Sequence, residues 1–148
     1  MKKLLLILGF CSSVNTLIAQ GQENTPAFQD SRHNLIGYVH AGSIVDQNNK
    51  FLGQFKYENQ EISILDSHHK TIGYIVKGTE IQDANHNTTG YVSFDKTDYS
   101  AIVKNAQNAT VGLIKSDGTV ENASHSVVGY AVKTEPMWAA AYYFLLKF

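Results

Sequence analysis

Six times this chain places an Asp or Asn seven residues before a Gly, and this repeated pair is the feature that most constrains its fold. Successive Asp or Asn markers lie 16, 20, 17, 22 and 17 residues apart. A fixed internal offset within a variable outer period indicates one supersecondary unit, reused with loops of different length. The six pairs are Asp30/Gly37, Asp46/Gly53, Asp66/Gly73, Asp83/Gly90, Asn105/Gly112 and Asn122/Gly129.

The residues around each Gly predict a β-strand. Most of the positions just before, just after and two after the Gly hold β-branched and aromatic side chains, which suit a pleated, half-buried surface. The apolar positions before and two after the Gly are three residues apart, which breaks the alternation of a strand. A β-bulge at the Gly would restore it. The alternative, also structural, is that Gly lets a neighbouring backbone approach closely.

A second strand is expected before each later marker, because an aliphatic residue stands two positions before it. Pairing this strand with the strand after the marker gives five β-hairpins. Residues 30–39 are then left as a closing half-unit. The five hairpins are centred on the loops after Asp46, Asp66, Asp83, Asn105 and Asn122.

The loops after the markers carry a turn signature. Asp and Asn open turns by hydrogen bonding to backbone groups two residues on. The third residue after each marker is His or Asn, types enriched at positive φ. Converging loops would turn the histidines into a metal cluster, but Asn49 and Asn108 fill the same position. We therefore favour turn geometry and predict no metal and no cofactor. The histidines concerned are His33, His69, His86 and His125.

Four copies show the repeat most clearly: Ile36-Gly37-Tyr38-Val39, Ile72-Gly73-Tyr74-Ile75, Thr89-Gly90-Tyr91-Val92 and Val128-Gly129-Tyr130-Ala131. This pattern resembles that of the five-fold beta-flower proteins, a family of small secreted bacterial proteins. The resemblance covers roughly residues 28–133. Copies two and five depart from it, with Gln54 and Leu113 in the Tyr position. The resemblance implies hairpin petals around a pseudo-five-fold axis and no assigned activity.

The length of the units leads to the same fold class. Units of 16 to 22 residues hold two strands each, whereas a four-stranded propeller blade takes ~40 residues. A two-stranded unit cannot bury its apolar face alone, so neighbouring units must stack or close a ring. Closure also removes exposed sheet edges. We predict an all-β fold of five repeated β-hairpins around a pseudo-five-fold axis, closed and flower-like, over residues 30–133.

Residues 1–19 have the features of a secretory signal peptide. Two lysines precede a short apolar run, and Ala19 offers a small residue for cleavage. We therefore expect an exported protein, periplasmic or secreted, with residues 20–29 as a linker. A lipoprotein cysteine at Cys11 is the weaker alternative, because Phe10 stands where a small residue is expected.

Composition argues against several classes of function. Cys11 is the single cysteine and falls in the segment expected to be removed, so no disulfide framework or thiolate site is expected. The two lysines of that segment leave with it, which takes the formal net charge from −1 to −3. Nucleic acid is not an expected partner, because phosphate recognition needs clustered Lys and Arg. The sequence has no Gly-x-Ser-x-Gly elbow, phosphate-binding Gly loop or His-Glu-x-x-His motif, and we predict no enzyme.

Residues 134–148 form an apolar C-terminal segment outside the repeat. The segment opens with a capping hydroxyl, an acid and a proline, which favours a helix start. After the proline only Lys147 is charged. A segment apolar on all sides must be buried, and a helix of ~18 Å is too short to span the ~30 Å hydrocarbon core. We predict a helix or plug docked on the β-ring that buries Trp138, Phe144 and Leu145. A final strand, or insertion into a partner, are the alternatives.

The repeated tyrosines are the candidate ligand-binding residues. Exposed on one face, they could stack on sugars or grip a peptide; buried, they would pack in the core or between petals, which we favour. The predicted function is a structural or interaction module of the bacterial cell envelope, with an unknown envelope protein or a glycan as partner. A weaker alternative is an enzyme that uses Asp95 and Asp98. The four tyrosines are Tyr38, Tyr74, Tyr91 and Tyr130.

The signal peptide assignment predicts one defined N-terminus. Protein recovered from the exported fraction should begin at Gln20, because a signal peptidase cuts after a small residue. N-terminal sequencing and intact mass test this. A retained Met1, or a lipid-modified Cys11 at the N-terminus, would contradict the assignment.

Overall fold

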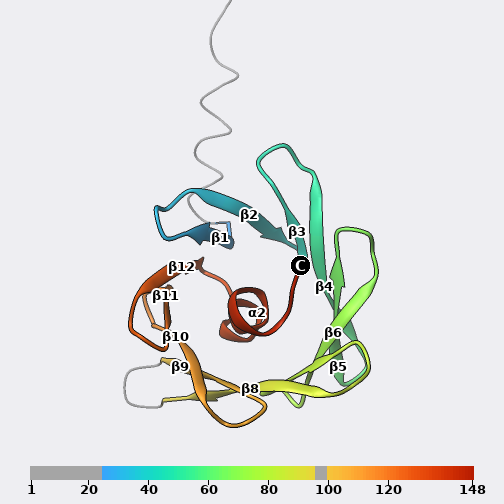
Figure 1. Ribbon diagram of the computed structural model, residues 1–148. Helices are drawn as coiled ribbons and strands as arrows, with labels where there is room; N and C mark the ends of the chain where they lie inside the picture. Colours follow the sequence, from blue (N-terminus) through green and yellow to red (C-terminus); the bar gives the residue numbers. More distant parts are fainter. Residues whose placement is uncertain (1–24, 96–99) are drawn as a thin grey trace, which may run out of the picture.

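The structure is a computed structural model that describes residues 25–95 and 100–148. The predicted signal peptide lies outside these residues. Within them, twelve strands form a closed antiparallel barrel around a central helical segment (Figure 1). The strands are β1 (Ala27–Asp30), β2 (Leu35–His40), β3 (Ser43–Val45), β4 (Phe51–Glu58), β5 (Glu61–Asp66), β6 (Thr71–Val76), β7 (Glu80–Asp83), β8 (Thr88–Phe94), β9 (Ala101–Asn105), β10 (Thr110–Ile114), β11 (Thr119–Asn122) and β12 (Val127–Val132).

Each strand pairs with its neighbours along the chain, and β1 pairs with β12 to close the ring. The prediction of a closed all-β ring is therefore confirmed. The five expected hairpins are formed, but the five-fold arrangement is not confirmed, because β1 and β2 make a sixth hairpin across Asp30. Phe28, two residues before Asp30, fills the apolar position of the repeat and is fully buried. Strand β1 thus begins inside the range expected to be a linker.

The six marker loops share one turn geometry, as predicted. In each loop the Oδ1 atom of the marker accepts the backbone N–H groups two and four residues on, as in Asp83, which accepts from Asn85 at 2.8 Å and Asn87 at 2.9 Å. The third residue takes the left-handed conformation, with φ between 60° and 64° in all six loops. The remaining Oδ1 pairs are Arg32 and Asn34, Asn48 and Lys50, His68 and Lys70, Gln107 and Ala109, and Ser124 and Ser126.

The predicted β-bulge occurs in each of the six hairpins that carry a marker loop. The pairing register shifts by one residue beside each repeat Gly, so the residue just before the Gly is the extra one; in β4, Gly53 pairs with Ile44 and Phe51 with Val45, which leaves Leu52 unpaired. The same shift recurs in the other five hairpins. The repeat glycines have no positive φ, so the bulge does not need their backbone freedom. They are needed for space.

The C-terminal segment is helical and occupies the barrel, which confirms the predicted plug. Helix α2 (Pro136–Ala140) is followed by a wider π-helical turn, η1 (Ala141–Leu145), in which Leu146 N–H donates to the Ala141 carbonyl at 3.0 Å. Trp138 is buried as expected, whereas Phe144 and Leu145 are half-buried. The Thr134 hydroxyl does not cap the helix and donates instead to the Val132 carbonyl at 3.0 Å.

Five tail side chains rest on five successive repeat glycines. A Cβ added to Gly112 would lie 2.2 Å from Phe144, and one added to Gly129 would lie 2.5 Å from Tyr143. The next three pairs, in reverse order around the ring, are Gly90 with Leu145, Gly73 with Leu146, and Gly53 with Phe148. At the sixth glycine, Gly37, the nearest side chains are Ile44 and Leu52, which come from the barrel wall.

The tail also braces the seam where the barrel closes. The Tyr143 hydroxyl lies 2.7 Å from the carbonyl oxygen of Gln29 on β1 and 3.0 Å from that of Tyr130 on β12, and it accepts the Gln29 N–H at 3.2 Å. The Tyr142 ring stacks on Phe28 at 4.3 Å between centroids. Burial raises the pKa of Tyr143 far above its usual range, so its hydroxyl stays a donor. In the part of the chain that the structure describes, no helix is both long and apolar enough to cross a bilayer.

A double-mutant cycle tests the fit of tail on glycine. Gly112→Ala should lower the free energy of unfolding by about 1–3 kcal/mol, because it overpacks the site of the Phe144 ring. Adding Phe144→Ala should remove most of that penalty. The matched pair is Gly90→Ala with Leu145→Ala, where the penalty should persist because the Lys104 carbonyl oxygen is 2.2 Å from the added Cβ. Urea unfolding measures the unaltered protein, the four single variants and the two double variants; additive effects of Gly112→Ala and Phe144→Ala would contradict the fit.

The marker carboxylates predict a component of acid sensitivity. Hydrogen bonds, from the Lys70 backbone to Asp66 and from the Asn87 side chain to Asp83, lower the pKa of both carboxyl groups. A folded-state pKa below the unfolded value of ~3.9 gives stability that is present above that pH and lost as pH falls through the folded value. The Asp66→Asn/Asp83→Asn variant keeps the turn, as Asn122 does, and should lose less stability below pH ~4.

Urea midpoints measured from pH 6 downward at fixed ionic strength check this. Asn122→Asp is the reverse control and should steepen the acid loss. Parallel curves for all three proteins would contradict the assignment.

Candidate functional site

The four predicted binding tyrosines lie on the outer face of the barrel. Each follows an inward-facing repeat Gly and precedes an inward residue such as Val39 or Ile75, both nearly fully buried. Tyr91 is 39% exposed. The others, Tyr38, Tyr74 and Tyr130, are half-buried. Since they sit on β2, β6, β8 and β12, the structure does not bring them together in one site.

Histidines of the marker loops cover two of these tyrosines. His33 stacks on Tyr130 with ring centroids 3.9 Å apart, and His86 stacks on Tyr74 at 4.3 Å. In each case the histidine belongs to the next hairpin around the ring, so the stacked rings link two neighbouring hairpins. The histidines therefore cover faces of the tyrosine rings on which a sugar would have to stack. They fit the predicted packing between petals, while a binding role for the tyrosines stays a prediction.

The marker histidines are spread over separate loops. Among residues 25–95 and 100–148, no group of three or more His, Cys, Asp or Glu side chains is placed to hold a metal ion. Asp98, one of the two loop carboxylates considered for catalysis, lies outside the described residues.

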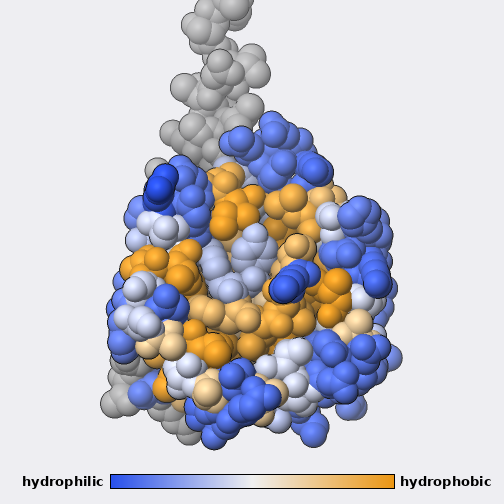
Figure 2. Space-filling model, in the orientation of Figure 1, coloured by the Kyte–Doolittle hydropathy of each residue, from blue (hydrophilic) through white to orange (hydrophobic). Residues whose placement is uncertain are grey.

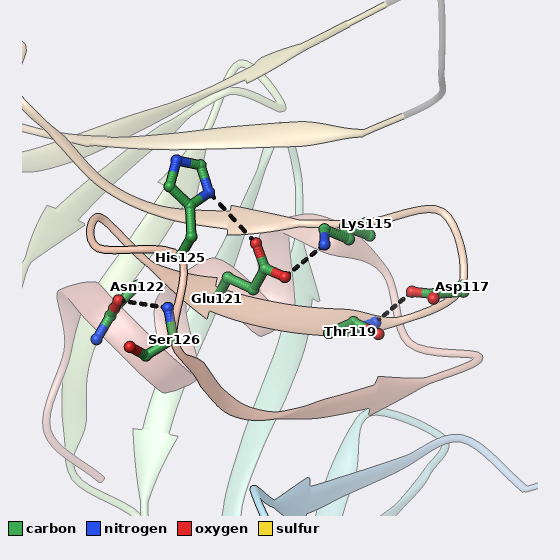
Figure 3. A network of polar contacts seen from close by, with 7 residues as sticks. All are labelled: Lys115, Asp117, Thr119, Glu121, Asn122, His125 and Ser126. Carbon is green, nitrogen blue, oxygen red and sulfur yellow. Dashed lines mark hydrogen bonds and ion pairs between the residues drawn. The ribbon is translucent and has the colours of Figure 1, made fainter.

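A buried carboxylate contacts two basic side chains near the last marker loop (Figure 3). Glu121 on β11 pairs with the Lys115 ammonium and lies 3.5 Å from Nδ1 of His125. The hydrogen bond from Lys115 is the main cause that lowers the pKa of Glu121. A carboxylate that holds an imidazole can orient a general base. The Gln82–His86 pair repeats this contact at 3.3 Å in another hairpin, so we interpret it as a brace of the loop.

An apolar collar surrounds the end of the tail. It consists of the bulge residues just before the repeat glycines, which are half-buried and pack against the core. Leu52 shows their direction, because its Cδ1 would lie 3.2 Å from a Cβ added at Gly37. Among these positions Thr89 is the polar one, and its hydroxyl donates to the Ile81 carbonyl at 3.0 Å. The apolar members are Ile36, Leu52, Ile72, Val111 and Val128.

Figure 2 shows apolar side chains in a ring around the centre of this face, inside a hydrophilic rim; the centre of the face is weakly hydrophilic. Within the collar the tail contributes half-buried residues and Phe148, which is 37% exposed. The sequence carried a signal for this surface, because an aliphatic residue precedes five of the six repeat glycines. The sequence alone predicts a bulged strand here and not a collar, because the direction of the bulge residues depends on pairing with another strand.

The chain was compared with known protein families. A family model described as "5-fold beta-flower protein" matches residues 12–101 and, in a second overlapping register, residues 57–147. Two registers are what an internally repeated chain allows. Neither a search of curated proteins nor a search of solved structures found a match.

Proposed function

This chain belongs to the 5-fold beta-flower protein family, and from that premise we propose that it is a non-enzymatic, exported interaction module of the bacterial cell envelope. The observation that carries the proposal is the apolar collar with its polar rim. Protein interfaces have the same anatomy, an apolar centre surrounded by polar residues. A contiguous apolar patch rimmed by polar residues is a mark of interaction sites on protein surfaces.

The occupant we propose is an envelope protein that inserts an apolar projection into the collar. The loops of the rim hold four Asp carboxylates and three cations, Arg32, Lys50 and Lys70. Without a cation excess this face is poorly suited to an anionic lipid surface, which attracts apolar faces bordered by Lys and Arg. A partner protein needs only apolar complementarity at the centre and hydrogen bonding at the rim.

The non-enzymatic part of the proposal is supported by what the polar groups already do. The marker carboxylates accept backbone N–H groups in their own turns, and Glu121 is held by Lys115. Carboxylates committed to structural partners are poor candidates for proton transfer. The alternative of glycan binding on the tyrosine row is favoured by one observation, the exposed ring of Tyr91.

Site-specific photo-crosslinking in the native host tests the proposed collar. A crosslinking amino acid at Val111 or Val128 should give one discrete adduct with an envelope protein, and the same group at Gln54 on the outer face should not. The purified partner should then bind the mature protein, with affinity lowered by tenfold or more in Val128→Lys, about 1.4 kcal/mol, and unchanged in Gln54→Lys. Equal adducts from both faces, an adduct with a second copy of this chain, or an adduct with lipid alone would contradict the proposal.

A further inference from the structure

We propose that the mouth of the barrel opposite the marker loops binds an uncharged sugar ring in a cleft beside Tyr57. Strand β4 leaves its marker loop at Phe51 and reaches Tyr57 at the other end of the barrel. The site is therefore at the opposite end from the collar, is separate from the outer tyrosine row, and does not depend on the proposed function. The cleft has a volume of about 280 Å³ and is lined by Tyr57, Asn59, Gln60, Glu61, Ile62, Ile75 and Gly78.

Three neighbouring strands build the apolar wall of the cleft. Tyr57 pairs with Ile62, and Ile62 pairs with Ile75, so the three side chains lie side by side across β4, β5 and β6. Tyr57 is 64% exposed, although it lies on the same inward-facing side of β4 as Gly53 and Phe55. A large ring that points toward the axis and still meets solvent is a platform for a flat, partly apolar ligand.

The plug holds this platform in place. The Tyr57 hydroxyl donates to Oε1 of Glu135 at 3.2 Å, and Glu135 is the residue that precedes helix α2. Partial burial and the Glu135 carboxylate raise the pKa of Tyr57. Trp138 lies beside it, with ring centroids 6.3 Å apart, and stacks on Phe55 at 4.7 Å. A ring fixed before binding loses little freedom when a ligand arrives.

The polar groups of the cleft select the ligand class. Asn59, Gln60 and Glu61 supply amide and carboxylate groups that donate to and accept from hydroxyls. Glu61 and Glu135 disfavour an anionic ligand. An aliphatic wall, an aromatic platform and hydroxyl-binding amides together match a neutral saccharide.

The single tryptophan makes binding directly measurable. Trp138 is the one Trp of the chain and is the ring neighbour of Tyr57, so its fluorescence should change on titration of the mature protein with neutral probes. The probes are oligosaccharides of hexose and of N-acetylhexosamine, one set each. At least one should bind, with a dissociation constant raised tenfold or more by Tyr57→Ala and little by Tyr57→Phe. Gln60→Ala, on an exposed turn, is a second variant; it leaves the rings of Tyr57 and Trp138 in place and should also weaken binding.

Tyr91→Ala, on the outer face, is the matched control and should bind like the unaltered protein. A uronic acid oligomer should not bind. The proposal is overturned if no neutral probe changes the fluorescence, if Tyr91→Ala abolishes binding while Tyr57→Ala does not, or if choline binds and the sugars do not. None of these results bears on the collar, whose test uses a protein partner.

Discussion

The filling of the barrel by the tail is the constraint on which the rest of the structure depends. Eight strands close around a space that their own side chains can fill, and a wider barrel encloses a space that something else must occupy. Twelve strands close here, and the C-terminal segment occupies the centre. The row of repeat glycines on the inner face of the barrel leaves space for the tail. At five hairpins a methyl group added to the glycine would collide with a tail side chain. The wider π-helical turn spreads successive residues at a smaller angle than the ~100° of an α-helix, which suits contacts with successive hairpins.

Local chemistry builds the ring in which this happens. Each marker turn fixes a hairpin, five of the six bulges turn an aliphatic residue toward the axis, and each repeat Gly leaves a recess beside it. The closing seam has the further support of Tyr143, whose hydroxyl contacts both β1 and β12. The two ends of the barrel have different surfaces, because the marker loops lie at one end and the plug begins at the other. One end is the apolar collar inside polar loops, and the other is the aromatic corner of Tyr57 and Trp138.

The sequence predicted the local features and missed those that depend on distant residues. Turn residues such as Asp83 and His86 act within a few positions, so their geometry follows from residue type, and the bulge follows from the broken alternation. The sixth hairpin was missed because β1 has only four residues and its partners are β2 and the distant β12. The fit of Phe144 on Gly112 is a contact across 32 positions that no periodicity encodes. Tyr57 lies outside the repeat pattern, and its exposure depends on where the plug begins, next to Glu135.

Removal of the tail tests the central claim most directly. A chain ending at Glu135 keeps all twelve strands, the six marker turns and the glycine row. If the tail is the core of the barrel, this chain should lose its cooperative thermal transition and near-ultraviolet circular dichroism, and a peptide of residues 136–148 should restore both. A truncated chain that unfolds at the temperature of the full-length protein, with the same cooperativity, would contradict the account.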